Sequence, residues 1–135
     1  IFGFGAKEKD IAIQLSIEKN LYINADRNRL RQAVSNLIDN AIKYTRIKGC
    51  IKIEAKHEND YIEISITDNG PGIEHGDRDK IFNRLYRADK SRSEKGLGLG
   101  LSVVQAVTMA HQGHVKVDSS PGSGSRFTMR LPKSQ

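Results

Sequence analysis

The segment 67–101 places an acidic residue at the end of a predicted strand and a glycine-rich sequence at the start of a predicted helix. The strand is predicted over 61–67 (YIEISIT), where three isoleucines occupy alternate positions and therefore share one face. Asp68 has the same parity as those isoleucines, so its carboxylate is directed along the buried face. Because a buried carboxylate is costly unless it accepts a hydrogen bond, Asp68 is a candidate for binding an amine.

Glycines lie at both ends of this segment. The sequence 69–72 (NGPG) predicts a turn whose backbone is bare. The sequence 96–101 (GLGLGL) opens a helix predicted over 97–111. Glycines at a helix start leave backbone N–H groups free to approach an anion, and the helix dipole assists. An amine acceptor at one end and a phosphate nest at the other are two features that suit a nucleotide.

Neither glycine sequence identifies the site by itself. The pentapeptide 68–72 alone is typical of an ordinary turn. The glycines at 96–100 form no Walker loop, because no Lys-Ser or Lys-Thr follows, and no dinucleotide fingerprint, because SRSEK rather than a strand precedes them. Both together, with 81–87 (IFNRLYR) between them, are more specific. The connection is too long for a plain turn, which predicts a mobile lid over the nucleotide.

The clearest helical pattern runs over 26–45, with Asp26 as a plausible N-cap. Six apolar side chains repeat at helical spacing and predict its core face: Leu30, Val34, Leu37, Ile38, Ala41 and Ile42. Four polar or aromatic residues follow one side of the same helix: Asn36, Asn40, Lys43 and Tyr44. Asparagine is a poor helix former, so two of them one turn apart indicate either a solvated face or a site.

Alternating residues predict the remaining sheet. A half-buried strand is expected over 11–17, a short one over 21–23, and a hairpin of 49–57 with 61–67. Gly113 is expected as the C-cap of the second long helix. Two further strands follow, marked by Val115, Val117, Phe127, Met129 and Leu131. This order predicts a two-layer α/β sandwich in which helices cover one face of a mixed sheet.

Composition limits the class of protein. The 135 residues suit one domain, and no apolar run is long enough to span a membrane. Cys50 is the only cysteine, so neither a disulfide framework nor a zinc site is expected. A net charge of +6 permits nucleic-acid binding, but the basic residues alternate with acids and concentrate only over 84–95. That concentration lies inside the nucleotide loop, which favours phosphate or an acidic partner instead.

The sequence 68–72, the IFNRLYR segment and GLGLGL resemble the nucleotide-binding boxes of sensor histidine kinases. These kinases belong to an ATPase superfamily that includes gyrase and the heat-shock chaperones. The resemblance extends from about Lys7 to Pro132, so 7–135 is assigned to the catalytic and ATP-binding domain and 1–6 to a linker or tag remnant. It implies the Bergerat ATP-binding fold and the cofactors ATP and Mg²⁺.

The resemblance also implies residue roles. Asn40 would hold Mg²⁺ through its amide oxygen, Lys43 would contact phosphate, and Tyr44 would pack near the base. Asn36 stands where hydrolysing relatives have a glutamate that activates water, and an amide lacks that basicity. Asn36, Asn40, Lys43 and Arg87 therefore form the predicted catalytic set, in which Arg87 offsets charge on the γ-phosphate. The predicted nucleotide contacts are Asn40, Lys43, Tyr44, Asp68, Gly70, Gly72, Ile73, Phe82, Tyr86, Gly96, Leu97, Gly98, Leu99, Gly100, Leu101 and Ser125.

The implied activity is transfer of the ATP γ-phosphate to a histidine on a separate dimerisation domain, in two-component signal transduction. The four histidines of this chain (His57, His75, His111 and His114) lack the phospho-accepting context H-E-x-[RK]-x-P. The expected partners are the protein's own dimerisation domain and a response regulator receiver domain, with no nucleic acid. The isolated domain is expected to be a cytoplasmic monomer, and the full-length protein a homodimer in the bacterial inner membrane.

Three other functions remain open at this stage. A nucleotide-dependent switch would bind ATP without transferring phosphate, and would be recognised by a lost Mg²⁺ ligand or a lost glycine. A serine kinase that inhibits sigma factors shares the superfamily, but IFNRLYR argues against it. A nucleic-acid-binding domain would show affinity that falls steeply with salt.

Overall fold

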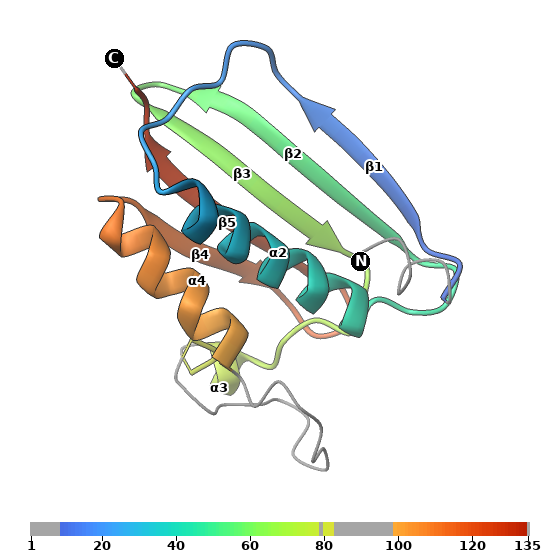
Figure 1. Ribbon diagram of the computed structural model, residues 1–135. Coiled ribbons are helices and arrows are strands. Elements are labelled where there is room, and N and C mark those ends of the chain that lie inside the picture. The colour runs from blue at the N-terminus through green and yellow to red at the C-terminus, as the bar shows by residue number, and fades with distance from the viewer. Residues whose placement is uncertain (1–8, 79, 83–98, 135) are drawn as a thin grey trace.

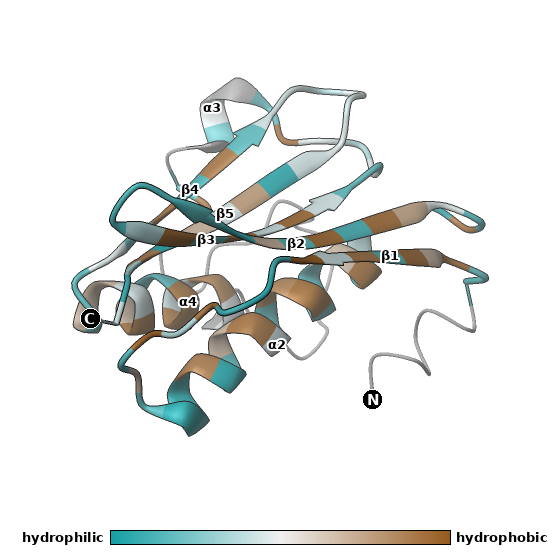
Figure 2. Ribbon diagram, turned by 90° about the horizontal axis from the view of Figure 1, so that it is seen from above, coloured by the Kyte–Doolittle hydropathy of each residue, from teal (hydrophilic) through white to brown (hydrophobic). Residues whose placement is uncertain are grey.

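The computed structural model describes residues 9–78, 80–82 and 99–134. They form a five-stranded sheet in the order β1-β2-β3-β5-β4. Two long helices, α2 and α4, pack together on one face of this sheet (Figures 1 and 2). The elements are β1 (Ala12–Ile17), α2 (Arg27–Tyr44), β2 (Cys50–Glu58), β3 (Tyr61–Asp68), α3 (His75–Arg78), α4 (Leu99–Ala110), β4 (His114–Ser119) and β5 (Ser125–Pro132).

The sheet is mixed, as predicted. The strand β1 runs parallel to β2, whereas the pairs β2–β3, β3–β5 and β4–β5 are antiparallel. Strand β3 is therefore central and has β2 and β5 as neighbours. The predicted hairpin of β2 and β3 is confirmed, with Glu58 opposite Tyr61. The two-layer α/β sandwich predicted from the sequence is confirmed.

Helix α2 begins and ends within one residue of the predicted bounds. The Oδ1 atom of Asp26 accepts hydrogen bonds from the N–H groups of Asn28 and Arg29, each at 3.1 Å, which satisfies two of the unpaired donors at the helix start. The buried face of α2 consists of Ala33, Leu37, Ile38, Ala41 and Ile42. This face packs over the sheet, so the polar side that carries Asn36 and Asn40 lies at the border of the core.

The core lies between the two layers and is centred on β3 and β5. Ile62 and Ile66 of β3 are buried, as the alternation predicts. Phe127 stands opposite Ile66 in the register of the two strands. The core also contains buried side chains of β5 and α4: Phe127, Met129, Leu131, Val104 and Val107. The end of β3, which carries Asp68, is thus fixed from both sides.

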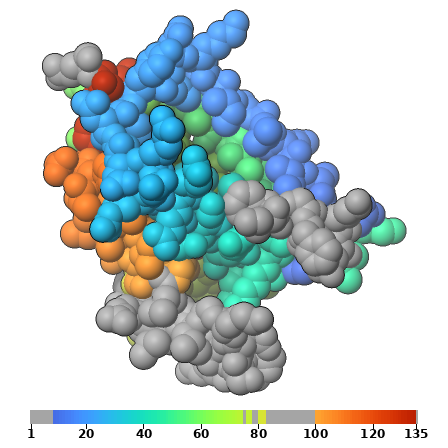
Figure 3. Space-filling view, in the orientation of Figure 1, coloured from blue at the N-terminus to red at the C-terminus, as the bar shows by residue number. Residues whose placement is uncertain are grey.

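Strand β1 is not half-buried, and that prediction is wrong. Ile11, just before the strand, is buried, but Ile13, Leu15 and Ile17 are 37%, 69% and 56% exposed. The cause is position, because β1 is an edge strand that borders the face covered by α2 (Figure 3). Alternation predicts which side chains share a face, but it does not predict how far a helix covers that face.

The short strand predicted over 21–23 is also wrong. Its residues belong to the connection between β1 and α2. The Tyr22 carbonyl accepts a hydrogen bond from the Ser134 N–H at 2.9 Å, and Ile23 packs against the core. An apolar triplet can thus be held by packing and one backbone bond without continuing as a strand.

The end of α4 differs from the prediction that Gly113 is its C-cap. Gln112, not Gly113, has a positive φ of 61°. The Gly113 N–H reaches back to the Thr108 carbonyl at 2.9 Å. A Cβ at Gly113 would overlap the carbonyl oxygen of Arg130, so the glycine is required for close approach to β5.

None of the helices in the described ranges combines the length and apolar character that crossing a membrane demands.

Candidate functional site

Asp68 is buried at the end of the central strand, as the parity of β3 predicts, with 6% of its surface exposed. Its Oδ1 atom accepts a hydrogen bond from the Gly70 N–H at 2.8 Å. Ile51 of β2 and Ser125 of β5 are its neighbours in the sheet register. The carboxylate therefore sits at one end of the sheet among backbone groups.

Burial raises the pKa of the Asp68 carboxyl above its ordinary value of 3.8. Hydrogen bonds from the backbone of Gly70 and of Ser125 lower that pKa, but burial is the larger effect. Asp68 thus combines desolvation with partial satisfaction by backbone donors, an arrangement that leaves it suited to accept from a ligand.

The turn after Asp68 packs against the C-terminal end of α2. Gly70 is buried, and a Cβ at this position would overlap the carbonyl oxygen of Tyr44. The Oδ1 atom of Asn69 accepts a hydrogen bond from the Cys50 N–H at 3.1 Å, which ties the same turn to β2. The predicted residues Asp68, Gly70 and Tyr44 are therefore brought together, across a distance in sequence, by the backbone of the turn.

The asparagine side of α2 faces the start of α4. The Nδ2 atom of Asn36 donates to the Gly100 carbonyl at 3.3 Å, and a Cβ at Gly100 would lie 3.8 Å from the Asn36 Cβ. Asn40 lies one turn further along α2 and is half-buried. The structure thus joins two of the predicted sequence boxes, the asparagines of α2 and the glycine-rich start of α4.

Lys43 is exposed in the last turn of α2, and Tyr44 is half-buried. The Lys43 Nζ atom lies 5.5 Å from the centroid of the Tyr44 ring, within the range of a cation–π contact. These two side chains extend the polar side of α2 from Asn36 and Asn40 toward the turn at Gly70. The four predicted residues of α2 therefore occupy one connected side of the helix.

The turn after Asp68 also packs against the turn between β4 and β5. A Cβ at Gly72 would overlap the Ser120 carbonyl oxygen, and a Cβ at Gly124 would overlap that of Asp68. Both glycines have positive φ, 78° and 80°. The structure gives Gly72 this packing role, and a direct contact of Gly70 or Gly72 with nucleotide stays a prediction.

Ser119 connects these turns and was not predicted. Its Oγ atom accepts from the Ile73 N–H at 2.8 Å, donates to the Gly124 carbonyl at 2.8 Å, and lies 3.0 Å from the Ser125 Oγ. The predicted residues Ile73 and Ser125 thus meet through a third side chain. The signal that could have identified Ser119 is parity, because it follows Val115 and Val117 at alternate positions of β4.

Apolar contacts support the site from the core. The rings of Phe82 and Phe127 meet edge to face with centroids 6.2 Å apart, and Ile81 beside them is buried. Leu101 of α4 is partly buried against the same core. Phe82 is therefore packed on the domain, and its predicted contact with nucleotide stays a prediction.

Some of the predicted site lies outside the described residues. These are Tyr86, Arg87, Gly96, Leu97 and Gly98, together with most of the predicted lid. Leu99 begins α4, but its side chain is also outside the described part of the chain. Their roles stay predictions.

Comparison with known proteins gives consistent matches. The family described as histidine kinase-, DNA gyrase B- and HSP90-like ATPase matches residues 25–135. The adaptive-response sensory kinase SasA of Synechocystis sp. is 41% identical over 127 residues, covering 93% of this chain and 33% of that protein. The solved structure of the mycobacterial sensor histidine kinase MprB has a TM-score of 0.84 at 30% identity, covering 96% of this chain and 89% of that chain. Full-length ShkA in complex with AMPPNP has a TM-score of 0.87 at 31% identity, covering 99% of this chain and 28% of that chain.

The fold, the site and these matches define an ATP-binding domain of the two-layer α/β class. The chain belongs to the histidine kinase-, DNA gyrase B- and HSP90-like ATPase family, and within it to the ATP-binding catalytic domains of sensor histidine kinases. The family predicted from the nucleotide-binding boxes is thereby confirmed. The chain spans about a third of the length of the curated relatives it matches.

Proposed function

We propose that Asp68 recognises the adenine of ATP by accepting a hydrogen bond from its exocyclic amine. The observation that carries this proposal is the burial of the Asp68 carboxylate at the end of β3, beside the turn that packs on Tyr44. A buried acceptor favours binding of a ligand that donates a hydrogen bond to it, and it disfavours a ligand that leaves it unpaired. Guanine presents a carbonyl in place of the amine, so GTP is expected to bind more weakly than ATP.

The residues of α2 fit a magnesium ion at the phosphates. Asn40 offers a hard amide oxygen on the half-buried side of the helix that faces α4. Within the described ranges, no group of three His, Cys, Asp or Glu side chains is placed to hold a metal ion. Asn40 would hold the magnesium ion, which would supply charge neutralisation and alignment of the triphosphate when bound.

The remaining polar residues favour phosphoryl transfer over hydrolysis. Lys43 extends from the last turn of α2 and offers positive charge to the phosphates. Asn36 donates its amide to the Gly100 carbonyl, and an amide has no basicity with which to activate water. Arg87 would add a second cation at the γ-phosphate, from outside the described residues. The acceptor is a histidine of a separate domain, where the imidazole nitrogen attacks the γ-phosphorus and ADP leaves.

The partners and location of the whole protein follow the same proposal. The phospho-accepting histidine would lie on the protein's own dimerisation domain, and a response regulator receiver domain would then take the phosphate. The isolated domain would be monomeric, and the complete protein a homodimer. A cytoplasmic position for this domain and an inner-membrane position for the complete protein stay predictions.

Asp68→Asn tests adenine recognition, because it keeps the size of the side chain but can present an amide donor to the adenine amine. Loss of one hydrogen bond to a charged group is worth about 1.5–3 kcal/mol, so affinity should fall on the order of tenfold to a hundredfold. Asp118→Asn is a matched control, since that carboxylate is exposed on β4. Calorimetry that gives Asp68→Asn the ATP affinity of the unchanged protein would overturn the assignment.

A further inference from the structure

The side chain of Lys9 closes the C-terminal end of α2. Its Nζ atom donates to the carbonyl oxygens of Ile42 at 2.8 Å, Lys43 at 2.8 Å and Thr45 at 3.0 Å. An ammonium has three N–H donors, and each here has an acceptor. The last carbonyls of a helix have no partner within the helix and carry the negative end of its dipole, so a cation is the favoured cap.

No glycine cap ends this helix. Thr45 has extended backbone angles and donates its N–H to the Ala41 carbonyl at 2.9 Å, after which the chain leaves toward β2. The Thr45 hydroxyl also donates to the Ala41 carbonyl, at 2.6 Å. The carbonyls further along the last turn are taken by Lys9, which is distant in sequence, so the geometry of this turn depends on a residue outside the helix.

Lys9 is itself fixed in position by the backbone. Its carbonyl accepts from the Lys48 N–H at 2.7 Å, and the Ala12 N–H nearby donates to the Gly49 carbonyl at 3.0 Å. The segment before β1 therefore pairs with the loop after α2. The backbone of Lys9 is therefore fixed to the loop after α2, and this places the Lys9 ammonium against the end of the helix.

The turn that Lys9 closes carries part of the candidate nucleotide site. Lys43 contributes both a carbonyl that accepts from Lys9 and the side chain proposed for the phosphates. The carbonyl of Tyr44 lies so close to Gly70 that a Cβ there would overlap it. A shift of this turn would therefore move Lys43 and Tyr44 relative to Asp68 and Gly70.

We propose that Lys9 is a positioning residue of the nucleotide site, which holds the last turn of α2 in register with the turn after Asp68. The proposal rests on the function proposed above, in which α2 binds the phosphates and Asp68 binds the base. Lys9 lies outside both sets and acts through the helix end. Its loss should therefore weaken binding of the phosphates more than binding of the base.

The test compares Lys9→Met with Lys48→Met, which removes the same charge from the same end of α2 but none of the three bonds. The dissociation constants of Mg-ATP and of adenosine are measured for each folded protein. Lys9→Met should weaken Mg-ATP by about three- to thirtyfold, the range found when a coupling contact is removed. Adenosine should weaken by a smaller factor, because Tyr44 moves with the turn whereas Asp68 stays at the end of β3, and Lys48→Met should leave the ratio of the two constants unchanged.

Rescue and a ligand-free measurement complete the experiment. Lys9→Arg keeps the charge and several donors, so it should recover most of the Mg-ATP affinity. In the absence of nucleotide, the NMR amide signals of Tyr44 and Gly70 should shift in Lys9→Met and not in Lys48→Met. Should Lys9→Met fail to fold, Lys9→Gln, which keeps two donors without the charge, is measured in the same way.

The outcomes separate the two proposals. An unchanged ratio of Mg-ATP to adenosine affinity in folded Lys9→Met or Lys9→Gln would overturn the role of Lys9 while leaving the proposed function in place. Equal loss of both affinities would do the same, because it would indicate a general loosening of the domain. Failure of the unchanged protein to bind Mg-ATP would instead contradict the proposed function, and the amide signals would still decide whether Lys9 fixes the turn.

Discussion

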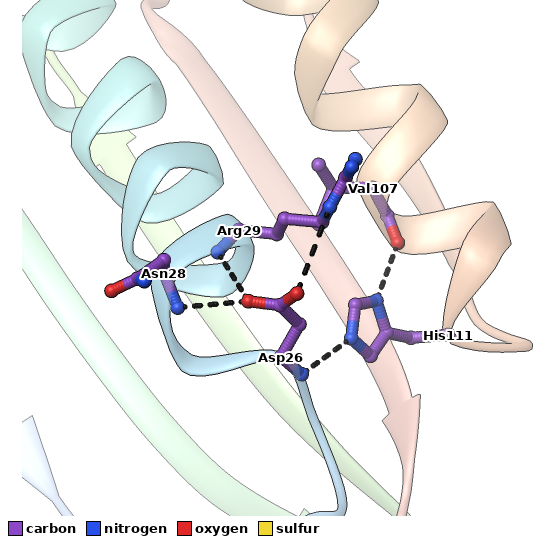
Figure 4. A network of polar contacts seen from close by, with 5 residues as sticks. All are labelled: Asp26, Asn28, Arg29, Val107 and His111. Carbon is purple, nitrogen blue, oxygen red and sulfur yellow. Dashed lines mark hydrogen bonds and ion pairs between the residues drawn. The ribbon is translucent and has the colours of Figure 1, made fainter.

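The backbone N–H of Asp26 donates to the Nε2 atom of His111 at 3.0 Å, which joins the start of α2 to the end of α4 (Figure 4). The other ring nitrogen, Nδ1, lies 2.8 Å from the Val107 carbonyl. Because Nε2 accepts, the proton of the neutral imidazole belongs on Nδ1, which donates to Val107. Asp26 also caps α2 through its side chain, so this pair of residues fixes two helices at one end of the molecule.

His111→Ala should lower the free energy of unfolding, because it removes both of these hydrogen bonds. Two hydrogen bonds at a partly exposed site are worth about 1–2 kcal/mol together. His114→Ala is the control, since that side chain is exposed at the start of β4. Urea unfolding followed by circular dichroism measures both variants. The same midpoint for His111→Ala and His114→Ala would show that the link between the helices contributes nothing.

Glycine substitutions should separate backbone strain from steric overlap. Gly122 has a φ of 82°, and within the part of the chain that the structure describes its Cβ position is open, so Gly122→Ala tests strain alone, about 1–2 kcal/mol. Gly124 has a φ of 80°, and its Cβ would overlap the Asp68 carbonyl, so Gly124→Ala should cost more than Gly122→Ala. Gly76→Ala is a control, because Gly76 has no positive φ and no atom of the described residues lies within 4 Å of its Cβ position.

The measurement is the free energy of unfolding of the three variants. We expect it to be lowest for Gly124→Ala, higher for Gly122→Ala and highest for Gly76→Ala. Gly124→Ala should also weaken ATP binding, because its Cβ would displace the backbone of Asp68. Equal stabilities for Gly122→Ala and Gly124→Ala would contradict the close approach of the two turns.

The parts of the site that local periodicity determines were predicted from the sequence. The burial of Asp68 was predicted because the alternation along β3 depends only on neighbouring residues. The buried face of α2 was predicted from its apolar repeat for the same reason. The exposure of Leu15 was not predicted, because it depends on how far α2 reaches over the sheet edge.

The contacts that were not predicted join segments far apart in the chain. Lys9 reaches the end of α2 across 33 to 36 positions of sequence, and Ser119 reaches Ile73 across 46. Each uses a side chain and a backbone group, and such pairs leave no periodic pattern. Asn69 likewise bonds the backbone of Cys50, 19 positions away. The packing roles of the glycines could be recognised only in the structure, because they depend on the carbonyl groups that face them.

Asp68 should stabilise nucleotide binding at a cost to the stability of the free domain. Burial raises the pKa of its carboxyl in the folded state above the value in the unfolded chain. The folded protein therefore holds this proton more tightly, so the contribution of Asp68 is most favourable below the ordinary aspartate range. That contribution is lost as pH rises from the unfolded pKa through the raised folded pKa.

Asp68→Asn should remove this loss, because an amide does not ionise. At neutral pH and without nucleotide, the variant should unfold at a urea concentration equal to or higher than that of the unchanged protein, although it binds ATP more weakly. The difference in unfolding free energy should shrink as pH falls below the raised pKa. A variant that is less stable at neutral pH and equally pH-dependent would contradict the burial of an ionised Asp68.

The last prediction concerns phosphoryl transfer to a separate chain. In the proposed function, Asn40, Lys43 and the start of α4 would supply the phosphate-handling groups, whereas no histidine of this chain has the phospho-accepting sequence context. The domain alone should therefore bind Mg-ATP with little hydrolysis and no autophosphorylation. Given its own dimerisation hairpin as a separate chain, it should phosphorylate a histidine there slowly, because separation forfeits an effective concentration of about millimolar for a short linker.

Asn40→Ala should abolish this transfer, because the triphosphate would lose the metal that neutralises and aligns it. Asn28→Ala is the matched control, since Asn28 is exposed in the first turn of the same helix. The readout is label transferred from γ-labelled ATP, with the acid lability expected of phosphohistidine. Acid-stable label on the isolated domain would indicate a serine or threonine acceptor instead. Full transfer by the Asn40→Ala protein would show that Mg²⁺ is held elsewhere, and the role of Asn40 would have to be abandoned.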